Sequence, residues 1–167
     1  TPPRPGAAER YEVSKDGKTY TFIIRKGLKW SDGTPLNAHD FRYSWLRGLA
    51  PKTGSKNAQQ IWTYVKGGKA FNNGSNPDPN SVGIKVIDDH TLQVELEAPA
   101  AFFPDLVTYI AYAPVPRHVI EKHGKQWTRP ANIVVNGPYT MTEWKPRDKV
   151  VFKKNESYWD AKNVKIK

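Results

Sequence analysis

Four histidines and two adjacent aspartates are the residues whose types could support metal binding or acid–base chemistry. The histidines are His39, His90, His118 and His123, and the chain has no cysteine. Zinc sites use ligands at short, defined spacings, and the sequence contains neither HExxH nor a Cys/His cluster. His118 and His123 are five positions apart, which puts them on different faces of a helix. We therefore expect surface or capping roles for the histidines and predict no metal site.

Asp88 and Asp89 come nearest to a paired-carboxylate site. Neighbouring residues of a strand point to opposite faces, and two aspartates between apolar segments are typical of a turn. The serines occur without GxSxG or a Ser-x-x-Lys box, and neither GxxxxGK[ST] nor GxGxxG is present. The sequence therefore predicts a protein that is not an enzyme and holds no cofactor.

The charge balance supports a different hypothesis, a basic nucleic-acid-binding domain. Lys and Arg outnumber Asp and Glu by 26 to 16, giving a formal net charge of +10, and such a field attracts polyanions. Aromatic side chains could stack on bases or line a peptide groove, although we expect most of them in the core. The basic residues are scattered singly along the chain rather than massed on one face, which favours a solvated basic surface.

Three β-hairpins are predicted. In the first, Tyr20, Phe22 and Ile24 recur at the two-residue period of a strand, after an Asp16-Gly17 turn that follows residues 11–13. The second spans 84–96, where apolar and polar residues alternate, and the third joins 139–144 to 150–153.

Helices are predicted between these hairpins. Asn37 is a candidate N-cap for a helix that begins at Ala38, and Pro51 would end it. Its Phe41, Trp45 and Leu49 lie four residues apart on one face. Shorter helices are predicted at 58–65, stopped by Gly67-Gly68, at 102–107, and at 117–123, closed by Gly124; residues 72–80 are predicted as a loop. Without strict βαβ alternation, the fold class is α+β or mixed α/β, with mixed sheets and short helices.

One stretch is specific enough to suggest ancestry. It consists of Lys29-Trp30-Ser31-Asp32-Gly33-Thr34-Pro35-Leu36, followed by Asp40-Phe41 and Tyr43-Ser44-Trp45. Further segments of the same kind are Val86-Ile87-Asp88-Asp89-His90-Thr91-Leu92, Pro114-Val115-Pro116, Asn132-Ile133-Val134, Asn136-Gly137, Tyr139-Thr140 and Tyr158-Trp159. Together they resemble the periplasmic oligopeptide-binding proteins of ABC importers, extracellular solute-binding protein family 5, over essentially the whole chain.

The resemblance implies a fragment of a two-lobed binding protein outside the cytoplasm, either in the periplasm or on the outer face of the cytoplasmic membrane. It implies that residues 1–130 are the small extra domain of this architecture and that 131–167 are a segment returning to the N-terminal lobe. The implied partners are a peptide ligand, the remainder of the receptor chain and a membrane ABC permease, with no nucleic acid, and the protein is expected to be a monomer. Oligopeptides or murein peptides are the implied ligands.

One ligand contact of the family is expected within this chain. It is made by a tyrosine just after the Pro-x-x-x-Ser stretch that follows the first long helix, and the matching position here is Asn57. An asparagine lacks the aromatic wall, but its amide can hydrogen-bond to a peptide backbone. We therefore expect Asn57 to face the ligand.

Overall fold

The computed structural model describes residues 3–166, which pack as two compact units. Unit 1 contains the residues up to Lys26 together with Asn37–Pro114, and unit 2 contains Gly27–Leu36 together with the residues from Val115 onward. The chain therefore passes between the units three times. These bounds follow packing within the chain, whereas the predicted division at residue 130 concerns positions in a longer receptor.

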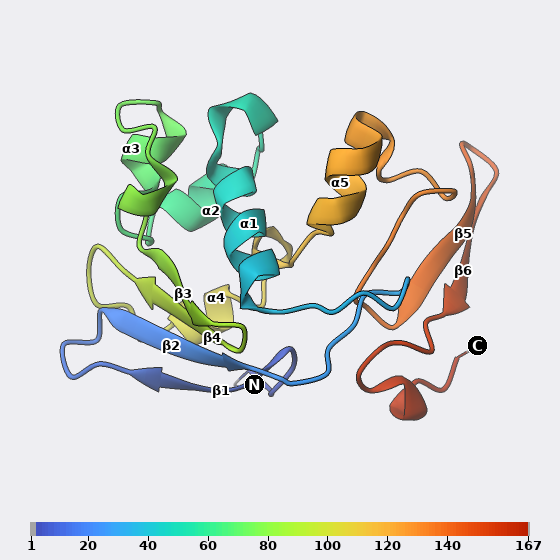
Figure 1. The fold of residues 1–167 in the computed structure, drawn as a ribbon, viewed down its shortest axis with the longest axis horizontal. Coiled ribbons are helices and arrows are strands. Elements are labelled where there is room, and N and C mark those ends of the chain that lie inside the picture. Colours follow the sequence, from blue (N-terminus) through green and yellow to red (C-terminus); the bar gives the residue numbers. More distant parts are fainter. Residues whose placement is uncertain (1–2, 167) are drawn as a thin grey trace. The chain divides into compact units, whose positions relative to one another are not determined.

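A four-stranded antiparallel sheet forms one layer of unit 1 (Figure 1). Its strands are β1 (Ala8–Val13), β2 (Thr19–Ile24), β3 (Ile84–Asp88) and β4 (Thr91–Glu95), in the order β1-β2-β4-β3. Tyr20 pairs with Val94 and Phe22 with Leu92, so their buried side chains share one face. The first two predicted hairpins are confirmed, and the long-range β2–β4 pairing joins them into one sheet.

Helices α1 (Ala38–Leu49), α2 (Ala58–Trp62) and α3 (Gly68–Asn72) lie over one face of this sheet (Figure 1). Unit 1 also contains α4 (Phe103–Leu106) and the 3₁₀ turns η1 (Pro51–Thr53), η2 (Pro79–Ser81) and η3 (Ile110–Tyr112). The buried stripe of α1 is as predicted: Phe41, Trp45 and Leu49 are all buried.

The start of α1 is fixed by a capping box. The Asn37 side chain accepts a hydrogen bond from the backbone N–H of His39 at 3.0 Å. In return, Asp40 accepts one from the backbone N–H of Asn37 at 2.9 Å. These bonds satisfy amides that would otherwise lack a partner in the first turn of the helix. The predicted cap is confirmed.

The predicted second helix is wrong at its C-terminal end. It stops at Trp62 rather than at residue 65 because Val65 forms a β-bridge with Leu96, and the N–H of Lys66 donates to the carbonyl of Glu95 at 3.0 Å. Gly67 then adopts φ +70° and caps α3, so the glycine pair starts a helix instead of ending one. Sheet pairing here overrides local helix propensity. The predicted loop at 72–80 is shorter in the structure, because α3 ends at Asn72 and η2 begins at Pro79.

Unit 2 contains α5 (Arg117–His123), η4 (Gly124–Gln126), β5 (Tyr139–Lys145), β6 (Lys149–Lys154) and η5 (Ala161–Asn163). The helix has the predicted bounds, and the β5–β6 hairpin confirms the predicted third pair of strands. The hairpin turns through Arg147 at φ +64°. β6 is exposed from Lys149 to Lys153, on both of its faces. Among residues 3–166, no helix is long and apolar enough to cross a membrane.

Candidate functional site

The Asp88-Asp89 pair forms a turn, as predicted. The Asp88 carboxylate accepts a hydrogen bond from the backbone N–H of His90 at 2.7 Å. This bond, together with one from the Thr91 side chain, lowers the pKa of Asp88. Asp89 instead lies 3.4 Å from the imidazole of His39. The two carboxylates therefore have separate partners, and among residues 3–166 no group of three or more metal-ligating side chains is found.

His118 lies in a polar cluster of unit 2. Its Nε2 is 2.7 Å from Oδ2 of Asp32, and Oγ1 of Thr34 lies 3.4 Å from the same nitrogen. The side chain is 42% exposed, in keeping with the predicted surface position. The sequence did not predict the pairing, because the two residues are separated by 86 positions.

Asn57 lies at the N-cap of α2, and its side chain makes no capping hydrogen bond. Its backbone is held, since its N–H donates to the Ser55 hydroxyl at 3.3 Å and its carbonyl accepts from the N–H of Gln60 at 3.0 Å. The residue is exposed. Asn57 is thus exposed to solvent on a backbone that is held by hydrogen bonds.

Tyr112 is the buried residue that fixes α2, and hence the position of Asn57. Its hydroxyl donates to the carbonyl of Gln60 at 2.5 Å, while its own carbonyl accepts from Nε1 of Trp45 at 2.8 Å. The rings of Trp45 and Tyr112 meet edge to face, with centroids 4.9 Å apart. Burial raises the pKa of the Tyr112 phenol, which keeps it protonated as a donor. Through these contacts Tyr112 connects α1 and α2.

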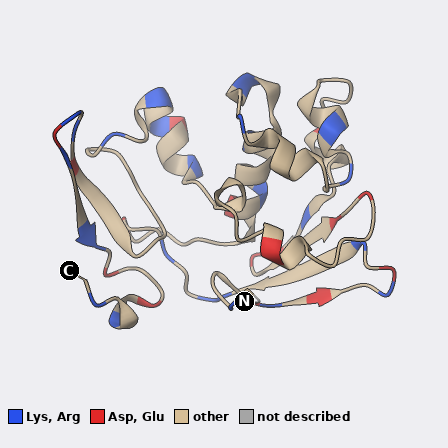
Figure 2. Ribbon diagram, turned by 180° about the vertical axis from the view of Figure 1, so that it is seen from behind, with Lys and Arg blue, Asp and Glu red and all other residues tan. Residues whose placement is uncertain are grey.

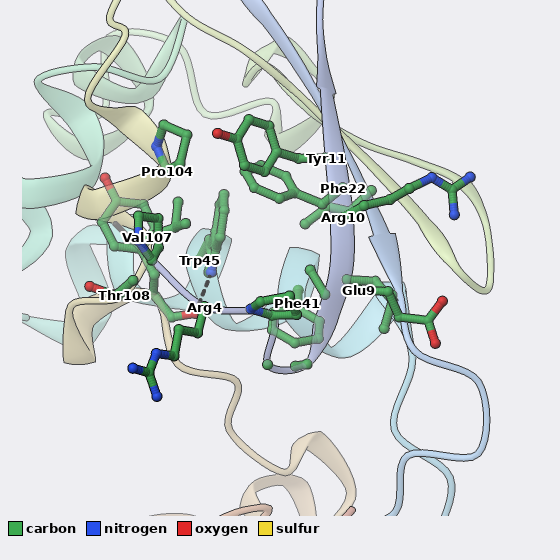
Figure 3. A pocket seen from close by; sticks show the side chains of 18 residues that line it. Arg4, Glu9, Arg10, Tyr11, Phe22, Phe41, Trp45, Pro104, Val107 and Thr108 are labelled. Atoms are coloured by element: carbon green, nitrogen blue, oxygen red, sulfur yellow. Dashed lines mark hydrogen bonds between the residues drawn. The ribbon is translucent and has the colours of Figure 1, made fainter. Parts of the chain in front are cut away.

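The same aromatic cluster forms the floor of a cavity of about 430 Å³ in unit 1 (Figure 3). Phe22, Phe41 and Trp45 line it from β2 and α1, and Tyr11 lies beside Phe22 at its rim. The other lining residues come from the segment 3–10, Ile24, Leu92, α4, Val107, Thr108 and Tyr112. A hollow of this size and apolar character can accept an apolar group.

Asn57 does not line this cavity, so the structure separates the predicted contact from this hollow of unit 1. The sequence predicted Phe41 and Trp45 as part of a buried stripe, and both of them, like Phe22, are at most 8% exposed. What the sequence could not show is that the helices leave part of this core uncovered next to β1. The exposed Tyr11, 46% accessible in a strand that is exposed from Glu9 to Val13, is the local sign of this gap.

Basic residues are distributed over strands, helices and loops of both units (Figure 2). Several are paired with acids: Lys66 with Glu95 at 2.6 Å, Arg117 with Glu121 at 2.7 Å, and both Lys145 and Lys149 with Glu143 at 3.0 Å. Ion pairing of this kind is typical of a solvated surface and reduces the charge available to a phosphate backbone.

Comparison with known proteins identifies the lineage of the chain. Residues 2–167 match the family model "Bacterial extracellular solute-binding proteins, family 5 Middle". The chain is 43% identical over 164 residues to the periplasmic oligopeptide-binding protein OppA of Escherichia coli K12, and 42% identical over 167 residues to the oligopeptide-binding protein OppA of Bacillus subtilis 168. These alignments cover 97% and 99% of the chain but only 30% of each relative.

Solved structures agree with this assignment. The periplasmic oligopeptide-binding protein OppAIV of Borrelia burgdorferi superimposes with a TM-score of 0.94 at 39% identity, over 98% of this chain and 32% of that protein. The chain therefore spans about a third of the length of the proteins it matches, in sequence and in structure. It belongs to the bacterial extracellular solute-binding proteins of family 5.

Proposed function

We propose that this chain is part of an extracytoplasmic receptor that binds oligopeptides and delivers them to an ABC permease, without making or breaking a bond. The observation that carries the proposal is the match to oligopeptide-binding proteins along nearly the whole chain, at 39–43% identity. The absence of a catalytic motif from the sequence is consistent with a binding role.

Within that receptor, residues 1–130 would form the small extra domain and residues 131–167 a segment of the N-terminal lobe. The exposed apolar residues of β6 support the second assignment. Val150 and Phe152 on one face, and Val151 on the other, are 37–57% exposed, and an isolated two-stranded hairpin is at best marginally stable in water. The remainder of the receptor would cover these faces, and the assembled protein would act as a monomer.

Asn57 would contribute to peptide binding through its side-chain amide. An amide offers both a donor and an acceptor, which matches the N–H and C=O groups that every peptide backbone presents. Its exposure and the fixed start of α2 support this role. Recognition of the backbone rather than of side chains would let the receptor accept many sequences.

Calorimetric titration of the complete receptor with a set of oligopeptides tests both levels of the proposal. Asn57→Ala should weaken binding about fivefold, corresponding to one hydrogen bond of roughly 1 kcal/mol. Gln59→Ala is the matched control, because Gln59 is an exposed amide two residues further along, in the first turn of α2. Unchanged affinity in Asn57→Ala would remove Asn57 from the site, whereas failure of the wild-type receptor to bind any peptide would overturn the function.

Nucleic-acid binding is the competing hypothesis, and charge is its main support. The distributed and partly paired basic residues argue against it, as do relatives named for peptide binding. We expect no retention of duplex DNA or RNA at physiological salt in a fluorescence anisotropy titration. Tight binding that falls steeply with added salt would reverse this conclusion, because counterion release produces such a slope.

A further inference from the structure

The loop Gly27–Leu36 is a short excursion of the chain that packs as part of unit 2. It closes on itself, because Lys29 and Pro35 form a β-bridge and the N–H of Leu36 donates to the carbonyl of Leu28 at 2.9 Å. Gly33 takes φ +86° at its tip, a conformation that favours glycine. The loop is thus a preformed element, and the side chains of its Leu28, Trp30 and Leu36 are buried.

Two sets of contacts fasten this loop within unit 2. Ser31 exchanges bonds with residue 135: its N–H donates to the carbonyl of Val135 at 2.8 Å, and its hydroxyl accepts from the N–H of Val135 at 3.1 Å. Separately, Asp32 contacts His118 on α5 at 2.7 Å, and the ring of Trp30 lies 6.5 Å from the imidazole, centroid to centroid. The first set is independent of pH near neutrality, but the second joins two titratable groups.

Hydrogen bonds within the loop orient the Asp32 carboxylate toward His118. Its Oδ1 accepts from the backbone N–H of Thr34 at 3.0 Å and from the Thr34 hydroxyl at 2.7 Å, which leaves Oδ2 for His118. Partial burial acts to raise the pKa of Asp32, but the bonds from Thr34 and His118 outweigh it, so the pKa lies below its ordinary value. Asp32 therefore stays charged in weakly acidic medium.

The imidazole of His118 is aimed at this carboxylate. A carboxylate can only accept, so Nε2 carries the hydrogen in the 2.7 Å contact. Along α5, Glu121 and Lys122 lie one turn away, and Glu121 is paired with Arg117 at 2.7 Å. From the loop, the charged group that contacts the ring is Asp32. The bond is already assisted by the charge of the carboxylate, and protonation at Nδ1 would add a positive charge to the donor and turn it into an ion pair, which strengthens it.

We propose that the His118–Asp32 contact is a pH-sensitive latch that holds the loop Gly27–Leu36 on α5 most firmly in weakly acidic medium. The latch is strongest where the imidazole is protonated and the carboxylate is not. It weakens when the imidazole is deprotonated, and weakens again as pH falls through the lowered pKa of Asp32. The inference does not depend on which solute the receptor carries.

Amide hydrogen exchange followed by NMR tests the latch in the intact protein. The Ser31 N–H reports release of the loop, since it is bonded to Val135 across unit 2. After correction for intrinsic rates, its protection factor should be about three- to tenfold higher at pH 5.5 than at pH 8. His118→Gln should abolish this difference, while His123→Gln on the same helix should preserve it. Equal protection at both pH values in the wild type would overturn the proposal.

A second measurement covers the case in which His118→Gln perturbs folding. Carboxyl NMR of the wild type and of Thr34→Val, which retains the imidazole, gives the pKa of Asp32 directly. Thr34→Val should raise that pKa while leaving the pH dependence of Ser31 protection in place, because the partner of the imidazole is retained. Loss of the pH dependence in Thr34→Val would show that the hydroxyl, rather than His118, controls the loop, and would equally overturn the latch.

Discussion

Unit 1 and unit 2 differ most in how they bury their apolar side chains. Nineteen of the 23 buried hydrophobic residues belong to unit 1, including Trp45, Phe103 and Tyr112. Unit 2 contributes Leu28, Trp30, Leu36 and Val119, while its β5–β6 hairpin leaves large side chains exposed on both faces. The difference indicates that unit 1 is held by its own interior and that the hairpin of unit 2 is built to pack against more chain.

Charge follows the same division. Lys and Arg number 13 in each unit, but Asp and Glu number 10 in unit 1 and 6 in unit 2. The excess positive charge therefore resides mainly in the unit with the smaller core. Self-repulsion of this kind disfavours a compact state unless other groups compensate it, so it adds to the expectation that unit 2 is the less stable half.

The largest expected effect contrasts one aromatic residue from each unit. Trp45→Ala removes a 3% exposed indole, its hydrogen bond and its ring contact, and should lower the free energy of unfolding by about 3 to 5 kcal/mol. Phe152→Ala, at a side chain that is 57% exposed, should change it by less than about 0.5 kcal/mol. Urea titration of the two variants measures both. Similar losses would mean that the hairpin is as firmly packed as the core.

Glycines provide a second contrast. Gly67 has φ +70°, and a Cβ there would lie 2.4 Å from the carbonyl oxygen of Ser81, so Gly67→Ala combines strain with a backbone clash. Gly124 also has positive φ but faces open space. We expect losses of more than about 2 kcal/mol at Gly67 and about 1 kcal/mol at Gly124, measured as shifts in thermal midpoint. Equal shifts in the thermal midpoint would show that backbone strain alone, without the clash at Gly67, determines the loss in both variants.

Removing the helix cap is a smaller perturbation confined to unit 1. Asn37→Ala deletes the acceptor for the His39 N–H and should lower the free energy of unfolding by about 1 kcal/mol. Asn37→Asp should restore most of it, because aspartate also caps helices. Chemical denaturation compares the variants. A loss in Asn37→Asp as large as in Asn37→Ala would show that the amide nitrogen, not the capping oxygen, matters.

The smallest expected effects concern the loss of stability in acid that arises from the aspartates of two turns, Asp88 and Asp32. Asp88 in unit 1 and Asp32 in unit 2 both have lowered pKa values, so each stabilises the folded state above the ordinary carboxyl pKa of about 4 and loses this contribution as pH falls through the lowered value. The free energies of unfolding of Asp88→Asn and Asp32→Asn, measured between pH 6 and pH 2, should approach that of the wild type at pH 2. Asp32, which is partly buried, should show the larger difference at pH 6. If a variant is still less stable than the wild type at pH 2, the loss of stability comes from the altered side-chain geometry rather than from the lost charge.

Local signals predicted most of the secondary structure. The Asn37 cap, the alternation in the hairpins and Gly124 after α5 each act through neighbouring residues, and the structure confirms them. The end of α2 was mispredicted because Val65 is captured by Leu96, a partner 31 residues away. The Asp32–His118 contact and the cavity beside β1 also arise from residues distant in sequence, and periodicity carries no information about such contacts. Asn57 remains a prediction based on resemblance, because its exposure permits a role in binding without proving one.

The discontinuity of unit 2 has a consequence for biosynthesis. The loop Gly27–Leu36 leaves the ribosome long before its partners, since His118 follows Asp32 by 86 residues and Val135 follows Ser31 by 104. At about 5 to 20 residues per second, roughly 4 to 20 s separate the loop from these partners. In that interval β3 and β4, which lie in the segment Asn37–Pro114, can join β1 and β2 and complete the sheet of unit 1, whereas the loop must wait. A chaperone or export factor that keeps nascent chains extended would therefore find unit 2, rather than unit 1, as the last part of this protein to become native.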